Sequence, residues 1–166
     1  ISKNINLRNE KHRKSGDGKM TKDVLLSIKG LQFEGENDAS DLETITAAEY
    51  YKKNNHHYVI YEEIMEGFDG KVHNTVKIGP NLVDIKKKGV IGAHMVFELD
   101  KKSQTRYATP MGELIVEIGT NRIRIEEEEH HLLVLIGYSL DINYQHVSDN
   151  QIVMDICSRE KAKLSL

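Results

Sequence analysis

The sequence predicts an all-β protein in which about eight to ten antiparallel strands close into an up-and-down barrel. Between residues 24 and 158, apolar side chains recur at every second position in short runs, which is the period of a strand with one buried face. Nearly every run ends at turn-forming residues, so consecutive strands are expected to pair as hairpins. No helix is expected to cover a sheet edge, and closure removes exposed edges. A β-sandwich is the alternative architecture.

The strand-like runs follow one another along the chain. They cover residues 22–34, 42–53, 57–66, 71–78, 82–88, 93–99, 104–109, 113–119, 122–127, 131–147 and 151–158. In the first run the apolar positions change parity after Gly30, from Ile28 to Leu31 and Phe33, which indicates a bulge or bend. The second run could also form a short helix capped by Asp41, but we predict a strand. Run 131–147 is longer than an ordinary strand and is expected to bend near Gly137.

Turn residues separate the predicted strands. Asp69-Gly70 can supply the positive φ of a tight hairpin, and Gly79-Pro80-Asn81 interrupts a ladder. Ser148-Asp149-Asn150 is expected to join the last two strands. Both prolines, Pro80 and Pro110, stand where a strand should stop.

Length and composition limit the class of protein. A chain of 166 residues, 39% hydrophobic and 30% charged, is expected to form one globular domain with one core. Its longest apolar stretch, Leu132–Ile136, is too short for a membrane span or a signal peptide, so we expect a cytoplasmic protein without membrane association. The single cysteine, Cys157, cannot form an internal disulfide and is expected to be a small buried hydrophobe.

Charge divides the chain into a basic arm and an acidic body. Residues 1–19 contain six Lys and Arg against two acidic residues, and residues 20–166 contain 17 against 24. The arm has no apolar period, so we interpret it as a flexible extension, either a tag or leader or a basic tail for acidic surfaces. A barrel domain over 20–158 and a tail over 159–166 complete the predicted organisation. The acidic body argues against nucleic-acid binding.

An ordered set of residues resembles a known bacterial family. The set is Tyr61-Glu62-Glu63, Gly70-Lys71-Val72, Lys77, Gly89, Met95, Phe97, Tyr107, Gly112-Glu113-Leu114 and Thr120. Over about residues 21–157 it resembles the YwiB-like family of uncharacterised proteins, domain of unknown function 1934. The resemblance implies a calycin-like barrel, similar to lipocalins and fatty-acid-binding proteins, and leaves the function open. Lys88 and Met111 depart from the Arg and the aromatic residue usual in the family, and Lys88 could not reproduce a bidentate Arg–carboxylate contact.

The acidic pair Glu62-Glu63 is a poor candidate for acid–base catalysis. Neighbours on a strand point to opposite faces, whereas a catalytic carboxylate pair must flank one bond. We expect one of the two to face the lumen and to form a structural ion pair with Lys77 or Lys88. No nucleophile or phosphate-loop motif is present, so we predict no catalytic residue and regard an enzyme as the less favoured class.

The histidines do not form a metal-binding pattern. His56-His57 and His130-His131 each split across the sheet at turn edges, so we predict solvated hairpin residues. His73 and His94 are expected to make ordinary polar contacts. We therefore predict no metal and no cofactor.

Two runs of like charge are expected to be solvated. The four consecutive glutamates 126–129 predict an exposed hairpin tip, because like charges repel one another unless water screens them. Lys86-Lys87-Lys88 is typical of an outer barrel face or of a guarded edge strand.

Function must be inferred from the predicted barrel, which is either filled by its own side chains or able to hold one small ligand. The first hypothesis is a lumen that binds a small, largely apolar molecule. The side chains that could anchor it are Tyr61, Glu63, Lys77, Lys88, Tyr107, Thr120 and Tyr138. The alternative is a cytoplasmic protein-interaction module with a filled barrel and an exposed apolar patch. A homodimer is compatible with both.

Overall fold

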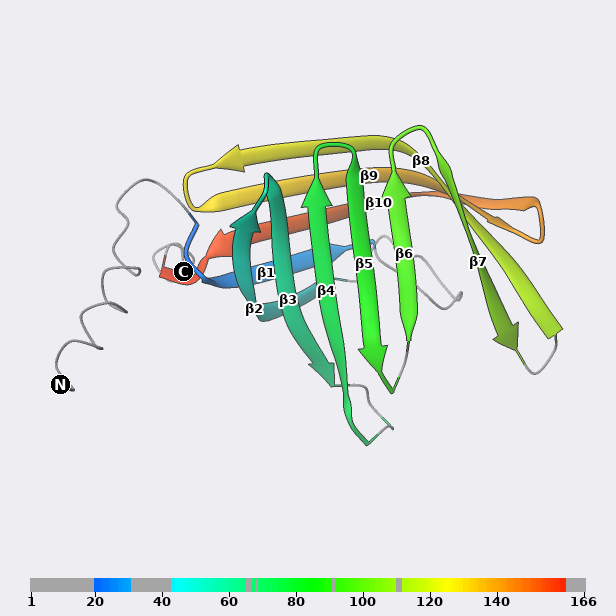
Figure 1. The fold of residues 1–166 in the computed structure, drawn as a ribbon, viewed down its shortest axis with the longest axis horizontal. Coiled ribbons are helices and arrows are strands. Elements are labelled where there is room, and N and C mark those ends of the chain that lie inside the picture. The colour runs from blue at the N-terminus through cyan, green and yellow to red at the C-terminus, as the bar shows by residue number, and fades with distance from the viewer. Residues whose placement is uncertain are drawn as a thin grey trace, which may run out of the picture.

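Ten antiparallel strands form one sheet in the part of the chain that the computed structural model describes, residues 20–30, 43–64, 67, 69–90, 92–109 and 112–160. They are β1 (Asp23–Lys29), β2 (Glu43–Lys53), β3 (His56–Ile64), β4 (Lys71–Gly79), β5 (Leu82–Gly89), β6 (Ala93–Glu98), β7 (Lys102–Thr109), β8 (Gly112–Glu128), β9 (His131–Ile142) and β10 (Gln145–Ser158). The long strands β8 to β10 cross the shorter strands β3 to β6 at a steep angle (Figure 1). The predicted second strand is confirmed, since residues 43–53 form β2.

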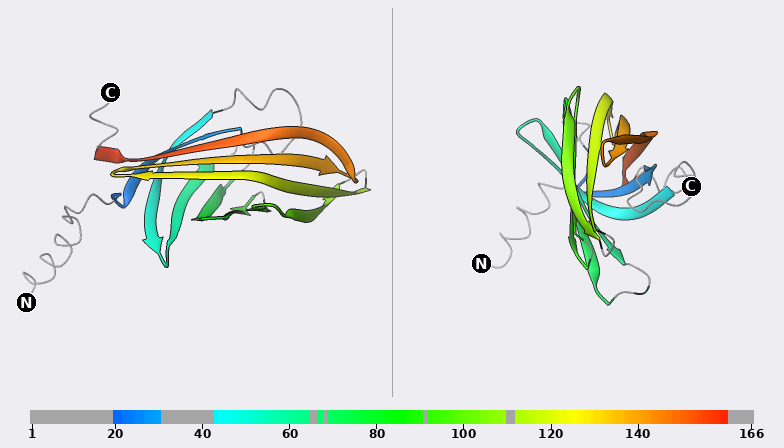
Figure 2. Two further views of the ribbon diagram at one scale, coloured as in Figure 1. Left: turned by 90° about the horizontal axis from the view of Figure 1, so that it is seen from above. Right: turned by 90° about the vertical axis from the view of Figure 1, so that its right-hand side faces the viewer.

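The sheet curls into a nearly closed barrel (Figure 2). Its order is β6-β5-β4-β3-β2-β1-β10-β9-β8-β7, so each strand pairs with its chain neighbour, β1 also pairs with β10, and β6 and β7 are the two edges. Near the chain ends of the barrel, the backbone N–H of Thr21 donates to Ser158 Oγ at 3.1 Å. The predicted all-β, up-and-down barrel is confirmed.

The inner face of the barrel carries one apolar core. Side chains alternate between the faces along each strand, and the inward set packs together with most members fully buried. The largest of them, each less than 2% exposed, are Phe97, Leu26, Ile78, Ile85, Leu132, Ile136, Ile152, Met154, Ile156, Val24, Val59 and Val72. These side chains form the apolar core inside the barrel. Cys157 is an exception to its prediction, because it lies half-buried between the inward neighbours Ile156 and Ser158.

Two predicted strands, 113–119 and 122–127, are one strand, β8. The ladder between β8 and β9 shifts between Thr120 and Arg122, so Asn121 is an extra, bulged residue. The two predicted strands are therefore separated by a bulge and not by a turn. A Cβ at Gly137 would lie 2.7 Å from Asn121 Oδ1, so the glycine leaves room for the bulge. Strand β9 is not interrupted at Gly137.

The predicted run 131–147 is in fact a hairpin of β9 and β10. Asn143 and Tyr144 form its two-residue turn with φ of 48° and 64°, as in a type I′ hairpin. Ser148-Asp149-Asn150 lies within β10, so the turn predicted there is wrong. Tyrosine is not a usual residue at positive φ, which is why the sequence did not indicate the true turn.

Other predicted breaks agree with the structure where it describes them. Gly30 follows β1 with a φ of 83°, and a Cβ there would lie 2.0 Å from Gln151 O, so the chain bends at this glycine. Gly70, with a φ of 125°, precedes β4, and Pro80 and Asn81 separate β4 from β5. The predicted arm 1–19, the parity change to Leu31 and Phe33, and Pro110 lie outside the described residues. No helix in the described part of the chain is long and apolar enough to cross a membrane.

Candidate functional site

Two of the predicted anchor residues, Tyr61 and Glu63, lie on the inner face of β3. Tyr61 is 3% exposed, and burial together with the hydrogen-bonded Glu63 carboxylate raises the pKa of its phenol above the ordinary value. Glu63 Oε1 accepts a hydrogen bond from Lys87 Nζ at 2.9 Å. The predicted partners of the inward glutamate, Lys77 and Lys88, are wrong, because alternation places both on the outer face.

The lysine run of β5 is divided between the two faces of the sheet. Lys86 and Lys88 are exposed on the outside, whereas the side chain of Lys87 is 12% exposed and points inward. β5 lies between β4 and β6, so the run is not a guarded edge, and its middle residue is not on the outer face as predicted. On the outside, Glu62 pairs with Lys71 at 3.0 Å, which lowers the pKa of the Glu62 carboxyl.

The remaining predicted anchors lie at the other end of the described barrel. Thr120 and Tyr138 face each other across the β8–β9 ladder and are 3% and 6% exposed. The Tyr138 ring meets the edge of Phe97 with centroids 5.2 Å apart, and burial raises the pKa of its phenol. Tyr107 pairs with Leu114 in the β7–β8 ladder, and its side chain lies outside the described part of the structure.

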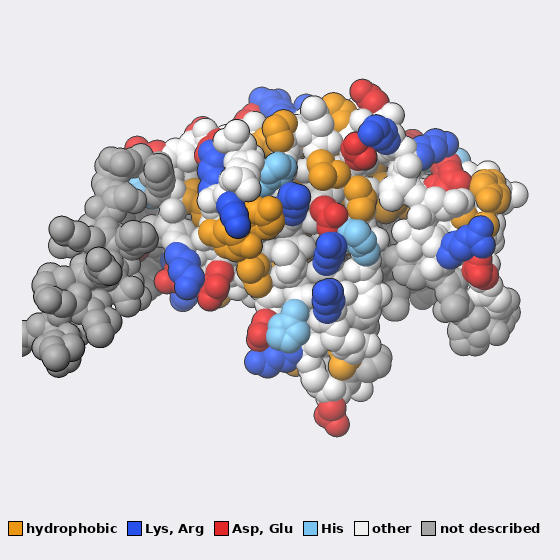
Figure 3. All heavy atoms as spheres, in the orientation of Figure 1, with side chains coloured by type: hydrophobic (Ala, Val, Ile, Leu, Met, Phe, Trp, Pro, Cys, Tyr) orange, Lys and Arg blue, Asp and Glu red, His pale blue; other side chains and the backbone are white. Residues whose placement is uncertain are grey.

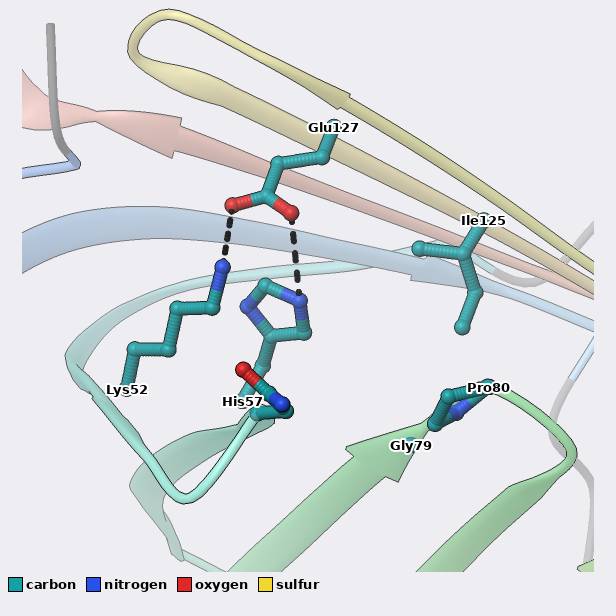
Figure 4. A pocket seen from close by; sticks show the side chains of 7 residues that line it. Lys52, His57, Gly79, Pro80, Ile125 and Glu127 are labelled. Atoms are coloured by element: carbon teal, nitrogen blue, oxygen red, sulfur yellow. Dashed lines mark hydrogen bonds and ion pairs between the residues drawn. The ribbon is translucent and has the colours of Figure 1, made fainter.

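A depression of about 330 Å³ opens at the end of the barrel where the β2–β3 hairpin and the β4–β5 turn approach β8 (Figure 4). Its lining residues are Lys52, Asn55, His57, Gly79, Pro80, Ile125 and Glu127. Lys52 and His57 are directly paired across β2 and β3 and so share the inner face. Asn54 and Asn55 make the tight turn between them with φ of 52° and 62°.

His57 is the centre of a chain of polar contacts in this depression. The Tyr50 hydroxyl lies 2.7 Å from His57 Nδ1, and His57 Nε2 lies 3.7 Å from Glu127 Oε2. Glu127 Oε1 accepts a hydrogen bond from Lys52 Nζ at 2.9 Å (Figure 4). Burial lowers the pKa of the His57 imidazole and outweighs the opposite effect of Glu127. A neutral imidazole with its proton on Nε2 accepts a hydrogen bond from the Tyr50 hydroxyl at Nδ1 and points its own N–H towards Glu127.

The same burial holds Tyr50 in its neutral form. Desolvation, followed by the nearby Glu127 carboxylate, raises the pKa of Tyr50 to about 12. Because both imidazole nitrogens of His57 face protein groups, the arrangement favours a binding role over proton transfer to a substrate. Ile125 and Pro80 supply apolar surface, and Lys52 and Glu127 supply one charge of each sign. The depression therefore suits a small molecule with an apolar body and one polar group.

The prediction that both histidine pairs are solvated is wrong for His57, which is only 5% exposed. Alternation turns it inward, whereas its neighbour His56 is half-buried and bonds the Asn54 carbonyl at 2.8 Å. His131 lies on the outer side of β9, 2.8 Å from Asp155, and His130 stands in the turn before it. In the described residues, no three or more His, Cys, Asp or Glu side chains are grouped as a metal site would require.

Sequence reading missed several members of these inner clusters, among them Lys87, His57 and Glu127. Lys87 and His57 each stand two residues from a buried apolar residue of the same strand, so the alternation contained the signal for both. Glu127 follows Ile125 at the same spacing, but it was expected at a solvated tip, where it is indeed half-exposed. Its contact with Lys52 joins residues 75 positions apart.

Comparisons with known proteins agree with this architecture. The model of a family described as "Domain of unknown function (DUF1934)" matches residues 26–154. The sequence is 26% identical over 128 residues to the uncharacterized beta-barrel protein YwiB of Bacillus subtilis (strain 168), which covers 77% of this chain and 84% of that protein. The structure is similar to the crystal structure of the ywiB protein from Bacillus subtilis, with a TM-score of 0.64 and 22% identity over 82% of this chain and 92% of the other. At that identity the structural likeness shows the fold alone.

Proposed function

The chain belongs to the DUF1934 family, as its resemblance predicted, and we propose that it is a barrel that binds a small, largely apolar ligand at the His57 end. The observation that carries the proposal is a buried histidine with a lowered pKa in the floor of a depression of about 330 Å³. Small-molecule sites are typically concave, mostly apolar and provided with few polar groups, and perturbed titratable groups gather in them.

The depression supports this proposal better than the middle of the barrel does. There the inward side chains pack against one another, so a deep ligand would have to displace fully buried groups such as Phe97 and Ile78. At the His57 end, a ligand can lay its apolar body on Ile125 and Pro80 without displacing the core. Its polar group can exchange with one partner of the Lys52–Glu127 ion pair, whose side chains are 45% and 48% exposed.

A probe-binding experiment tests the proposal. The fluorescent probe 8-anilinonaphthalene-1-sulfonate has an apolar body and one anionic group, and its emission rises in apolar surroundings. We expect saturable binding by the wild-type protein and binding at least about tenfold weaker by Ile125→Trp, because the indole fills the depression. Val147→Trp is the matched control, since Val147 is 55% exposed near the Asn143–Tyr144 turn and the same side chain there leaves the depression open.

Equal probe binding by the wild type and Ile125→Trp would remove the depression as the ligand site. Thermal unfolding of both variants shows whether each is folded, so weaker binding that results from unfolding can be recognised. Native mass spectrometry of protein purified without denaturation then searches for a ligand that was retained from the cell.

The second candidate function is a protein-interaction module, which the exposed apolar surface over β2 and β3 favours (Figure 3). Apolar side chains gather over β2 and β3 on the face shown in Figure 3, with charged side chains around them. On these strands the rings of Tyr51 and Tyr58 stack with centroids 4.7 Å apart, and Tyr51 is 44% exposed. Sedimentation velocity over a range of concentrations tests self-association through this face. A Tyr51→Glu variant that sediments like the wild type at every concentration would exclude it.

A further inference from the structure

A second set of polar side chains lies inside the barrel, towards the opposite end of β3 from His57. In the ladders of β3 to β6, Tyr61 pairs with Asn74, Asn74 with Lys87, and Lys87 with Ala93, so these four residues form one inward row. Glu63 belongs to the next row and bonds both Tyr61 and Lys87. We call Tyr61, Glu63, Asn74 and Lys87 the inner polar row.

Asn74 is the unsatisfied member of the inner polar row. Its side chain is 0% exposed, and its amide Nδ2 donates a long hydrogen bond of 3.4 Å to Val72 O. That bond orients the amide, so Oδ1 is the free atom, and Oδ1 has no hydrogen-bond partner among the residues that the structure describes. A buried acceptor without a donor is costly, and such groups in native proteins usually serve a ligand or a bound water.

The charges of the inner polar row limit what Asn74 can bind. Lys87 and Glu63 form an ion pair with side chains 12% and 26% exposed, so their charges compensate each other. An additional buried charge would lack a counter-ion, whereas a neutral donor group adds no uncompensated charge. Burial and Glu63 raise the pKa of Tyr61, so its phenol stays neutral and donates to Glu63. Ala93 pairs with Lys87 and has the smallest side chain of the four residues in the inward row.

We propose that the inner polar row is a second binding site, in which Asn74 Oδ1 accepts a hydrogen bond from a neutral N–H or O–H group of a small ligand. Glu63 and Lys87 keep part of their side chains exposed, so a ligand would enter beside them. The site uses none of the residues that line the His57 depression, so it stands or falls independently of the function proposed above.

Two probes of nearly equal shape test the proposal. N-methylbenzamide carries one neutral N–H donor, and methyl benzoate replaces that group by an ester oxygen. Each is titrated into isotope-labelled wild-type protein while NMR follows the side-chain amide signals of Asn74. We expect saturable shifts of these signals with the amide and affinity for the ester about tenfold weaker, because the ester cannot satisfy Oδ1.

The variant Asn74→Leu removes the acceptor at nearly constant volume, and Thr75→Val is its matched control on the outer face of the same strand. We expect Asn74→Leu to bind both probes equally weakly and Thr75→Val to retain the preference for the amide. If Asn74→Leu does not fold, the difference in affinity of the wild-type protein for the amide and the ester tests the proposal by itself. Absence of binding, equal affinity of the wild type for both probes, or shifts confined to residues around His57 would overturn the proposal.

Discussion

His57 couples protonation to folding, because the burial of its imidazole outweighs the attraction of the nearby Glu127 carboxylate. Burial lowers the pKa of His57 below the ordinary histidine value of 6.5, which approximates the unfolded chain. Between these two pKa values the unfolded state binds more protons than the folded state, so stability increases with pH there. The contribution is complete above the unfolded pKa and is lost as the pH falls through the window towards the folded pKa.

We predict that His57→Asn makes stability less dependent on pH between neutral and mildly acidic conditions. The asparagine can still accept a hydrogen bond from the Tyr50 hydroxyl, but it cannot gain a proton. The measurement is the midpoint of urea unfolding across this pH range. The control His56→Gln changes a half-buried neighbour and should keep the wild-type slope. A slope in His57→Asn as steep as in the wild type would show that other groups cause the pH dependence.

At the scale of single residues, alternation predicted much of the inner surface and little of its pairing. Tyr61 and Glu63 were placed near the lumen from the sequence, and Lys87 could have been, since it follows Ile85 at a spacing of two. The contacts of Lys52 and His57 with Glu127 were out of reach, because they depend on where β8 crosses the β2–β3 hairpin. That crossing is set by sheet curvature, which short-range patterns do not encode.

Strands of this barrel approach one another closely where glycines replace side chains. Gly89, at the end of β5, has a φ of 140°, and a Cβ there would lie 2.1 Å from Lys71 O on β4. Gly67 also has a positive φ, 85°, but a Cβ there would meet no atom within 4 Å. Both positions require a positive φ, but only Gly89 lacks space for a side chain.

We therefore predict that Gly89→Ala destabilises the protein by more than about 2 kcal/mol, because backbone atoms of β4 and β5 must move apart. Gly67→Ala should cost about 1 kcal/mol, which is the cost of the left-handed conformation alone. Urea unfolding of both variants measures the difference. Equal losses would show that the β4–β5 ladder can open at Gly89 without a penalty.

Elements were predicted well where turn residues are conventional and poorly where they are not. Gly79-Pro80-Asn81 correctly marked the β4–β5 connection, whereas Asn143-Tyr144 was overlooked because a tyrosine occupies a positive-φ position. Residues 120 and 121 were predicted to separate two strands, whereas the structure has a bulge there within one strand, β8. Both errors change where strands begin and end, and neither changes the predicted barrel architecture.

Among the described residues, the barrel has one discontinuity, the seam between the edge strands β6 and β7. No ladder joins these two strands within the described residues, and the turn Leu99–Lys101 connects them. β1, in contrast, is paired along its length with both β2 and β10. The number of predicted hairpins pointed to closure, but the sequence did not indicate where the seam falls, since this depends on the lengths and twist of all strands together.

Native-state hydrogen exchange should follow this asymmetry. We predict that amides of β1 and β9 exchange most slowly and that amides of β6 and β7 exchange markedly faster, because each edge strand has one neighbour instead of two. Exchange followed by NMR compares the four strands in a single sample, so each serves as a reference for the others. Protection of β6 and β7 as strong as that of β1 would show that the seam closes in solution or is covered by another chain.

The bulge at Asn121 also governs the distance across the candidate ligand site. Because Thr120 and Arg122 oppose consecutive residues of β9, a chain lacking Asn121 would still direct Ile125 and Glu127 inward. The additional residue bends and twists β8 locally, and this changes the direction of the strand beyond it. That direction sets the distance of Ile125 and Glu127 from His57. The width of the candidate ligand site can thus be changed by a substitution at Asn121, a position that a bound molecule would not touch.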